Sequence, residues 1–532
     1  MAQREQTTPR LVAVATADDQ RETIALLSTP SAYGPTVDDV QRIETHSAIV
    51  FLAGDRAYKL KRAVRYDDLD FSTLESRRRA CVAEVRLNRR TAPNLYLGRR
   101  PITFRPDGAL QLDGDGDTVD WVVEMARFDE SDVFDRMAER GELGVSLMPP
   151  LARAVARLHA VAEWRFDHGG RRSMAWVIDG NADGFAEYGP GVLDPAVCRH
   201  LTTLSHEMLE RQADRLTARR LQGFVRRCHG DLHLRNVCLI AGRPTLFDCI
   251  AFSDQAACID MLYDLAFLLM DLLHRRLGVH AHVVYNEYAT ATGDLDGLAL
   301  LPLFLSARAA VRARTSATAA RLQSDPADQS AFGAAAREYL DLAMSLIEPA
   351  PAQLVAVGGL SGAGKSTLAR RLAPTLGVPP GALVLRSDRV RQSLIGVRAP
   401  DRLDSQGYTE GVTRSVYREL AARATTATAA GRAVVVDAMF ADPRDRAVIA
   451  DVAQTVGVPF TGLWLDAPVD IRAARVTRRR DDPSDATPAA LREQPGRAVG
   501  EMDWHRLDAT PDDATLARSV GTMLGSPGRR SP

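Results

Sequence analysis

A glycine-rich run in the second half of the chain has the residue types and the spacing of a phosphate-binding loop. Residues 359–366 read GLSGAGKS and match the pattern G-x-x-x-x-G-K-[ST], between a strand-like run and a helix-like run. In this pattern glycines let backbone N–H groups surround phosphate oxygens, the lysine reaches the β- and γ-phosphates, and the hydroxyl ligates Mg²⁺. The run therefore predicts an ATP·Mg²⁺ site, with Lys365 also acting in catalysis and Ser366 as a metal ligand, whose contacts come from Gly359, Ser361, Gly362, Ala363, Gly364, Lys365, Ser366 and Thr367.

A second set of polar residues that could take part in catalysis lies in the first half of the chain. Residues 229–236 read H-x-D-x-x-x-x-N, and Asp248 follows at the end of a short β-like run. In eukaryotic-type kinases the Asp of this pattern accepts the proton of the acceptor hydroxyl, while the Asn and the later Asp hold Mg²⁺. The spacing therefore makes Asp231 a candidate catalytic base, and Asn236 and Asp248 candidate metal ligands. The alternative is a polar turn with no catalytic role.

Residues upstream of this pattern are candidates to complete the same site. Lys59, in the strand-like run DRAYKLK, is the candidate to bind the α- and β-phosphates, and Glu84, in an expected helix over 74–88, is its candidate partner. Lys61 competes with Lys59, because alternation along a strand places both on one face. The V-A-I-K register of kinases favours Lys59. The stretch VEMARF at 123–128 is the expected inter-lobe hinge against adenine, with Glu124 among the ATP-binding residues.

The lysines of this chain are few, and their positions coincide with the two predicted sites. Of 67 basic residues only Lys59, Lys61 and Lys365 are lysines, and all the others are arginines. A drift toward arginine codons explains the bias itself. Because lysine is a compact point charge and arginine a planar fork, the exceptions mark places where a point charge fits better.

The composition excludes several classes of protein. The formal net charge of −1 gives no global electrostatic reason to expect a nucleic acid or an anionic membrane as partner. Six cysteines without a C-x-x-C pair favour reduced thiols over a disulfide framework or a zinc site. The polar N-terminus and the absence of a long uncharged apolar run predict a cytoplasmic protein without a transmembrane span.

The expected secondary structure places these residues in two domains of different plan. Short strands near 48–60 and in 101–125, then mainly helices with one β-hairpin in 229–248, indicate an α+β domain over 1–349 with lobes at about 41–128 and 129–349. After a Pro-rich linker, β-rich runs alternate with helical stretches, which predicts a parallel sheet with crossover helices over 350–525. Residues 526–532 are expected to be a disordered tail.

The second half resembles small P-loop kinases, such as gluconate kinase-like, polynucleotide kinase-like and zeta toxin-like enzymes, over about residues 354–510. The resemblance implies that Asp388 is a candidate catalytic base and that Arg391 binds the acceptor, both in the run RSDRVR that follows the second strand. It also implies a Mg²⁺ or acceptor contact for Asp437, at the end of VVVDA. The alternatives are a helix N-cap for Asp388 and a turn residue for Asp437.

The arginine-rich run at 470–479, followed by DDPSDAT, looks like the lid of such kinases. Arg472, Arg475 and Arg479 share one helix face, and the resemblance implies that lid arginines neutralise the transferring phosphoryl group. Arg472 and Arg475 are therefore expected among the ATP-binding residues. The alternative is a solvated charged face.

The first half resembles the aminoglycoside phosphotransferase family over about residues 45–345. The whole chain is similar to bacterial proteins, many from actinobacteria, that fuse such a domain to a P-loop kinase domain. The resemblance implies an α+β protein-kinase-like domain followed by an α/β P-loop NTPase domain. It also implies two ATP·Mg²⁺-dependent modules that phosphorylate hydroxyls of small polar molecules, with a sugar or sugar acid favoured as acceptor.

One departure from the kinase pattern keeps alternative functions open. No glycine-rich G-x-G-x-x-G loop precedes Lys59, and residues 44–47 read ETHS at the equivalent place. This favours a nucleotide-binding pseudokinase that regulates the P-loop enzyme, whereas the intact residues Asp231, Asn236 and Asp248 oppose it. A second alternative is an aminoglycoside-resistance phosphotransferase, but a cationic acceptor needs a dense acidic pocket and the acidic residues here are scattered. A nucleic-acid end kinase is disfavoured by the balanced charge.

Overall fold

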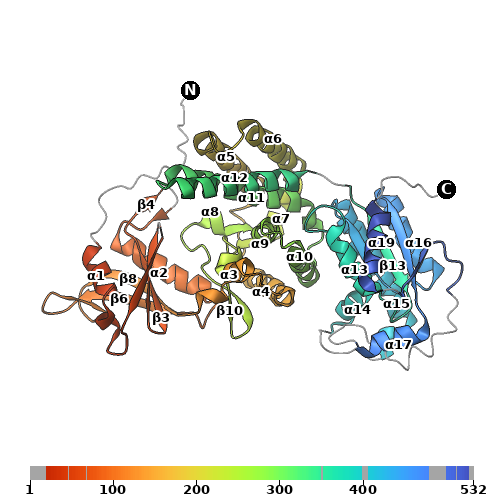
Figure 1. Cartoon of the computed structure of the whole chain (residues 1–532), viewed down its shortest axis with the longest axis horizontal. Helices are drawn as coiled ribbons and strands as arrows, with labels where there is room; N and C mark the ends of the chain where they lie inside the picture. Colours follow the sequence, from red (N-terminus) through yellow and green to blue (C-terminus); the bar gives the residue numbers. More distant parts are fainter. Residues whose placement is uncertain are drawn as a thin grey trace. The chain divides into compact units, whose positions relative to one another are not determined.

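The chain folds into two compact units, shown in a computed structural model that describes residues 20–45, 47–66, 69–348, 351–397, 405–478, 499–510 and 512–525. The first unit comprises Met1–Arg276 and Leu303–Ile347. The second comprises Leu277–Pro302 and Glu348–Pro532. Figure 1 follows the chain through both units.

The first unit begins with an antiparallel sheet of six strands in the order β1-β2-β3-β8-β6-β7. One face packs on α2 through Cys81, Tyr96 and Val123, and the other packs around Phe51 and Leu60. Helix α2 begins at a capping box formed by Thr73 and Ser76 and ends at Asn88, as the sequence predicts. The elements are α1 (Arg21–Leu27), β1 (Val40–Glu44), β2 (Ala48–Ala53), β3 (Arg56–Lys61), β4 (Arg65–Tyr66), β5 (Leu69–Asp70), α2 (Leu74–Asn88), β6 (Tyr96–Phe104), β7 (Leu110–Leu112) and β8 (Thr118–Ala126).

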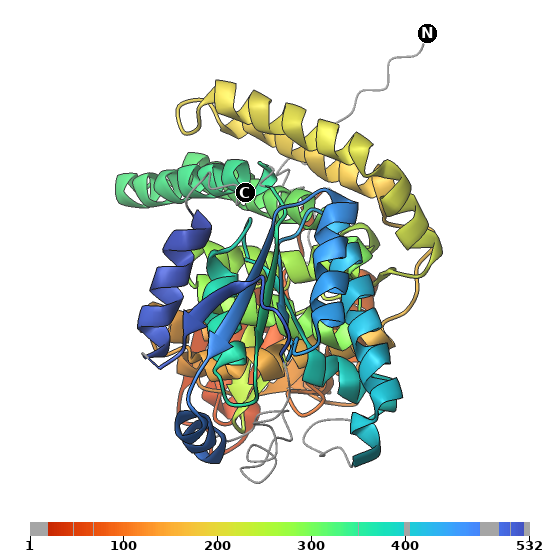
Figure 2. The same ribbon diagram turned by 90° about the vertical axis from the view of Figure 1, so that its right-hand side faces the viewer.

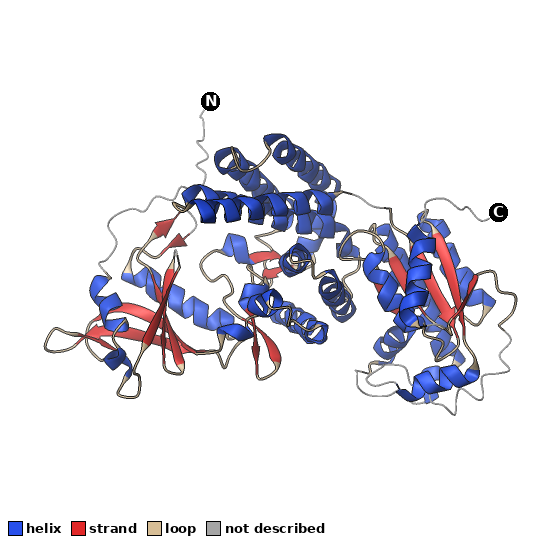
Figure 3. Ribbon diagram, in the orientation of Figure 1, coloured by secondary structure: helices blue, strands red, loops and turns tan. Residues whose placement is uncertain are grey.

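The rest of the first unit is mainly helical, with two small antiparallel strand pairs, β9 with β12 and β10 with β11 (Figure 3). Its central helix is α9, which is apolar on all sides except at two aspartates and is almost entirely buried. The elements are α3 (Phe134–Glu139), α4 (Met148–Val161), α5 (Gly170–Tyr188), α6 (Pro195–Arg211), α7 (Ala213–Leu221), β9 (Val225–Arg227), β10 (Val237–Ile240), β11 (Arg243–Leu246), α8 (Asp254–Ala257), β12 (Cys258–Asp260), α9 (Met261–His274), α11 (Leu301–Leu322) and α12 (Pro326–Ile347).

The second unit is built on a parallel sheet of five strands in the order β14-β15-β13-β16-β17. Helices α13 and α19 pack on one face, and α15 and α16 on the other (Figure 2). The parallel sheet with crossover helices is the predicted architecture, although β17 was not anticipated. The elements are β13 (Leu354–Gly359), α13 (Lys365–Leu372), β14 (Leu383–Arg386), α14 (Ser387–Ile395), α15 (Glu410–Ala429), β15 (Val434–Asp437), α16 (Pro443–Val456), β16 (Phe460–Asp466), α17 (Val469–Arg478), β17 (His505–Asp508) and α19 (Asp513–Gly525).

Helix α10 (Gly278–Thr292) packs with the second unit, whereas the sequence predicts it within the first domain, over 1–349. The side chain of Asn286 lies along the free edge of β14. It accepts a hydrogen bond from Val384 N at 2.7 Å and donates one to Ala382 O at 3.3 Å. His282 lies one turn earlier, 3.0 Å from Pro380 O, and burial lowers the pKa of its imidazole to about 4. A side-chain amide thus satisfies backbone groups that an edge strand leaves unpaired.

Asn286→Ala is expected to lower the free energy of unfolding of the second unit by about 1–3 kcal/mol, because Val384 N loses its acceptor in a partly buried place. Urea denaturation of the full chain, with hydrogen exchange of residues 382–386 as the local probe, measures the effect. Thr290→Ala, at an exposed position of the same helix, is the matched control and should stay within about 0.5 kcal/mol. Equal exchange at 382–386 in both variants would show that Asn286 does not hold the strand edge.

Among the described residues, no helix is long and apolar enough to cross a membrane.

Candidate active sites

In the first unit, β3 and α2 bring a lysine between two carboxylates. Lys59 Nζ lies 3.0 Å from Glu84 Oε1 and 2.6 Å from Asp248 Oδ1. The register of β3 places Lys59 opposite Val123 of β8, on the face that packs against α2. Burial lowers the pKa of Lys59, but Asp248 and Glu84 outweigh it and raise that pKa above its usual value, so the side chain is an ammonium ion.

Lys61 lies on the same face of β3 and pairs with the other carboxylate oxygen of Glu84. Its ammonium nitrogen is also 5.5 Å from the centre of the Phe71 ring. Glu84 is only 2% exposed, and burial raises the pKa of its carboxyl, but the two lysines lower it to about 2. The two lysines thus share one carboxylate. Between them, Lys59 is the one with an ion pair to Asp248, so the structure separates two candidates that the spacing left equivalent.

The candidate catalytic loop runs from His229 into the short 3-10 helix at Leu234–Asn236. The Asn236 amide donates to the backbone oxygen of Asp231 at 2.8 Å and to Asp231 Oδ2 at 2.9 Å. His233 Nε2 lies 3.2 Å from the same carboxylate oxygen. Burial raises the pKa of the Asp231 carboxyl, but the charge and hydrogen bond of His233 outweigh it and lower that pKa below its usual value. Asp231 is therefore an ionised carboxylate, as an acceptor of a hydroxyl proton must be.

The donors at the end of the β10–β11 hairpin fit Mg²⁺. Because the Asn236 amide nitrogen donates to Asp231, its oxygen remains as a ligand, and Asp248 adds a carboxylate that is 44% exposed. Amide and carboxylate oxygens are the hard donors that Mg²⁺ prefers. Asp248 has φ of +59°, an uncommon conformation for a residue other than glycine, and its backbone N–H donates to the Tyr96 hydroxyl at 3.0 Å.

Asp264 of α9 accepts hydrogen bonds from the backbone of the candidate catalytic loop. The sequence did not predict this role. In the structure Asp264 Oδ1 accepts from Gly230 N at 2.8 Å, and Oδ2 accepts from His229 N at 3.1 Å and lies 3.0 Å from His159 Nε2. The available signal was an aspartate inside the apolar run MLYDLAFLLM, since a buried charge must have partners.

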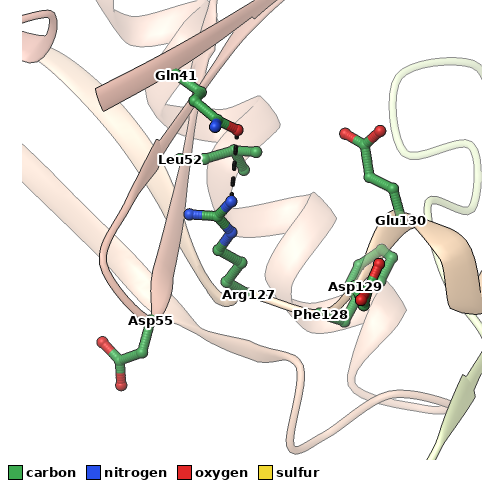
Figure 4. A pocket seen from close by; sticks show the side chains of 7 residues that line it. All are labelled: Gln41, Leu52, Asp55, Arg127, Phe128, Asp129 and Glu130. Carbon is green, nitrogen blue, oxygen red and sulfur yellow. Dashed lines mark hydrogen bonds between the residues drawn. The ribbon is translucent and has the colours of Figure 1, made fainter. Parts of the chain in front are cut away.

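A pocket of about 500 Å³ lies beside the expected hinge (Figure 4). Its Leu52 pairs with Ala57, two residues before Lys59, so the pocket opens on the lysine face of the sheet. Arg127 donates to Gln41 at 3.4 Å across it. The lining residues are Gln41, Leu52, Asp55, Arg127, Phe128, Asp129 and Glu130.

Glu124 is a predicted ATP-binding residue that the structure does not bring to this face. It pairs in register with Tyr58, one residue before Lys59, and therefore points to the opposite side of the sheet. There its carboxylate accepts from Arg100 Nε at 2.8 Å. The alternation along the strand that places Lys59 on one face of the sheet thus places the Glu124 side chain on the other face.

In the second unit, the glycine-rich loop joins β13 to α13, with Thr367 in the first turn of the helix. Gly359, Gly362 and Gly364 all have positive φ, and a Cβ at Gly359 would lie 2.7 Å from Leu465 O, so other residues do not fit there. Helix α13 begins at Lys365, so the positive end of its dipole faces the loop and favours an anion there. Lys365 Nζ lies 3.3 Å from Leu360 O, within the same loop.

Two strand ends and the first turn of α13 place a guanidinium, a carboxylate and a hydroxyl together at the carboxyl edge of this sheet. Ser366 Oγ donates to Asp437 Oδ2 at 2.6 Å. Arg386 pairs in register with Asp437 and contacts both groups. The hydroxyl and carboxylate oxygens of Ser366 and Asp437 form a donor set that fits Mg²⁺.

The candidate acceptor residues lie within the first five residues of α14. The residue before this helix is Arg386, so Asp388 is not its N-cap. Arg391 follows Asp388 by three residues and faces the same side. Its guanidinium is buried, donates to Gly407 O at 2.7 Å and lies 4.9 Å from the Tyr408 ring.

Two arginines of α17 contact the phosphate-binding loop. Arg472 donates to Ser361 O at 3.4 Å, and Arg475 donates to Ala363 O at 3.2 Å. Arg472 is 4% exposed, which does not fit a solvated charged face. Arg479 and the DDPSDAT run of the expected lid lie outside the described residues.

Comparison with known proteins agrees with the two architectures. The model of the phosphotransferase enzyme family matches residues 110–301, and that of an AAA domain matches residues 354–499. An uncharacterized protein of Mycobacterium tuberculosis is 30% identical over 491 residues, which are 90% of this chain and 93% of that protein. The adenylyl-sulfate kinase of Myxococcus xanthus is 32% identical over 168 residues, 31% of this chain and 81% of that enzyme.

Among solved structures, a choline/ethanolamine kinase family protein from Mesorhizobium loti aligns with 60% of this chain and 98% of its own, at 13% identity and a TM-score of 0.37. The folds, the sites and the family matches define a kinase-type phosphotransferase. The chain belongs to the bacterial family that joins an aminoglycoside phosphotransferase-like domain to a P-loop kinase domain, as the predicted resemblance has it.

Proposed function

We propose that both units are active modules, each transferring a phosphoryl group from ATP·Mg²⁺ to a hydroxyl of a small polar molecule. The observation that carries the proposal is the ion-paired chain Glu84–Lys59–Asp248 beside the Asp231–Asn236 loop, because it supplies the first unit with every charged group the reaction needs. The second unit supplies the corresponding groups from its glycine-rich loop, Asp437 and α14.

In the first unit, Lys59 would bind the α- and β-phosphates while Glu84 holds its ammonium group in place. Asn236 and Asp248 would hold Mg²⁺, which when bound neutralises charge on the phosphates. Asp231 orients the acceptor hydroxyl and takes its proton at a carboxylate oxygen. The pocket lined by Leu52 and residues 127–130 supports binding of the nucleotide base at the hinge.

In the second unit, the loop N–H groups and Lys365 would bind the β- and γ-phosphates, with Ser366 and Asp437 as ligands of Mg²⁺. Asp388 takes the proton of the acceptor hydroxyl. Arg472 and Arg475 already contact the loop and are placed to add positive charge beside the nucleotide.

The acceptor proposed for the second unit is a sugar acid or another anionic hydroxyl compound. Arg391 lies on the same helix side as Asp388, and its guanidinium fork suits a carboxylate or phosphate. The relative named adenylyl-sulfate kinase supports adenylyl sulfate as a second acceptor to test.

Release of ADP over a panel of acceptors tests the proposal in the full chain. The panel holds sugars, sugar acids, adenylyl sulfate, aminoglycosides and oligonucleotides, each with the parent protein, Lys365→Ala and Asp231→Ala. We expect Lys365→Ala to lower the turnover of one set of acceptors and Asp231→Ala to lower the turnover of another. Each loss should be at least about a hundredfold. Arg371→Ala and Asp341→Ala, at exposed positions of α13 and α12, are the matched controls.

The outcomes separate the candidate functions. If all turnover survives Asp231→Ala, the first unit is not a second enzyme, and regulation by a nucleotide-binding pseudokinase replaces the proposal. If all turnover survives Lys365→Ala, the P-loop unit is not the active kinase. Turnover of aminoglycosides alone would instead assign a resistance enzyme.

Reduced thiols support a place in the cytoplasm for this protein. All six cysteines are buried and unpaired. Burial raises the pKa of Cys81 to about 12 and that of Cys249 to about 11, so both are neutral thiols at physiological pH.

A further inference from the structure

Arg386 has no part in the function proposed so far, yet it lies among three residues that do. Its Nε is 3.2 Å from Asp437 Oδ2, and its Nη2 is 3.2 Å from Ser366 Oγ and 3.9 Å from Asp388 Oδ2. The side chain is 14% exposed, so water screens these contacts only partly. A guanidinium therefore contacts both oxygen atoms to which the proposed function assigns Mg²⁺.

The strand register explains why the arginine lies there. Arg386 ends β14 and pairs with Asp437, which ends the adjacent strand β15, so both side chains leave the sheet at its carboxyl edge. Ser366 reaches the same place from the first turn of α13. The position thus follows from the central architecture of the unit and not from a surface loop.

A guanidinium and Mg²⁺ compete for these oxygen atoms. Mg²⁺ binds its oxygen ligands at 2.0–2.1 Å and demands near-ideal octahedral geometry. An ion bound to Ser366 and Asp437 would therefore lie within a few ångströms of the guanidinium, where two positive charges repel strongly at low exposure. The phosphates of a nucleotide supply the negative charge that allows both cations to stay.

We propose that Arg386 is an internal cation that excludes divalent metal from the empty P-loop site and so makes metal binding depend on the nucleotide. Without nucleotide, Arg386 neutralises Asp437 in place of the metal. With nucleotide, the phosphates attract the guanidinium and Mg²⁺ takes the oxygens of Ser366 and Asp437. This inference rests on the proposed metal site of the second unit.

Metal binding in the absence of nucleotide tests the inference directly. Mn²⁺, a paramagnetic substitute for Mg²⁺, is titrated into the full chain carrying Asp248→Asn, which weakens the metal site of the first unit. Electron paramagnetic resonance then measures the free Mn²⁺. We expect Arg386→Gln, which keeps hydrogen-bonding capacity without charge, to bind Mn²⁺ about tenfold more tightly than its parent.

Two further variants make the result specific. Arg386→Lys keeps a positive charge and should bind Mn²⁺ as weakly as the parent. Arg371→Ala removes an exposed arginine of α13 and should also leave Mn²⁺ binding unchanged. Adding Asp437→Asn to Arg386→Gln should remove the gained affinity, which assigns the new binding to this site.

Equal Mn²⁺ affinity in Arg386→Gln and its parent would overturn the inference. A fluorescent ADP analogue, titrated into the same proteins with saturating Mg²⁺, separates that result from a failure of the proposed function. If the parent binds ADP and Lys365→Ala does not, the P-loop assignment stands whatever Arg386 does. If the parent binds no ADP at this site, both ideas fall, whereas weaker ADP binding in Arg386→Gln with unchanged Mn²⁺ affinity would make Arg386 a phosphate ligand instead.

Discussion

Lys59→Ala is expected to lower kcat/KM for ATP in the first unit by about two to three orders of magnitude, whereas Lys61→Ala lowers it by about tenfold or less. The reason is that the two ammonium groups contact different sets of carboxylates. Lys59 joins Glu84 to the candidate metal ligand Asp248, so its ammonium lies where phosphate charge would gather. Lys61 contacts the far oxygen of Glu84 and acts on the phosphates only through that carboxylate.

Each of the two lysine variants is the matched control for the other, because both remove the same group from the same face of β3. Turnover is measured in the full chain carrying Lys365→Ala, so that the P-loop unit contributes nothing. Glu84 keeps one lysine partner in either variant, which limits the damage to folding, and circular dichroism checks that both proteins are folded. A loss in Lys61→Ala as large as that in Lys59→Ala would mean that the phosphates are bound by the shared Glu84 cluster and not by Lys59 alone.

The sequence was sufficient for elements whose pattern is local. Helix α2 has the predicted bounds 74–88, since its start is set by a capping box next to a clear helical run. Strands β13 and β15 were recognisable as apolar β-branched runs. The glycine-rich loop was recognisable because its spacing and its place between strand and helix are both demanding.

The features that the sequence did not predict depend on contacts between residues far apart in the chain. Strand β17 reads HRLD, with mostly exposed side chains, so neither alternation nor β-branching marks it. The packing of α10 with the second unit depends on Asn286 meeting a strand edge about 100 residues later. Likewise, alternation could place Lys59 and Lys61 on one face, but only the position of Asp248 distinguishes them.

The partners of Asp264 were also beyond a local pattern, and their loss leads to the largest expected change in stability. Asp264→Ala should lower the free energy of unfolding of the first unit by about 3–5 kcal/mol, a large part of the 5–15 kcal/mol typical of a domain. The carboxylate is fully buried and satisfies two backbone N–H groups and one imidazole. Alanine would leave those donors buried without an acceptor.

Asp264→Asn separates support of the loop from support of the fold. Burial raises the pKa of Asp264, but the hydrogen bond and charge of His159 lower it to about 2, so the native group is an anion that only accepts. Asparagine keeps the shape and one acceptor but turns an N–H₂ group toward a donor. We therefore expect a smaller loss of stability than in Asp264→Ala, with a fall in kcat of the first unit and little change in KM for ATP, because the Gly230–Asp231 backbone shifts while Lys59 does not.

Urea denaturation of the full chain, followed by the fluorescence of the tryptophans, measures the stability of the three proteins. Asp341→Ala, an exposed aspartate of α12 in the same unit, is the matched control and should stay within about 0.5 kcal/mol of the parent. If the free energy of unfolding of Asp264→Ala equals that of the control, the hydrogen bonds from His229 and Gly230 to Asp264 do not hold the loop. If instead Asp264→Asn loses stability and ATP affinity together, Asp264 supports the whole lobe and has no selective effect on the placement of Asp231.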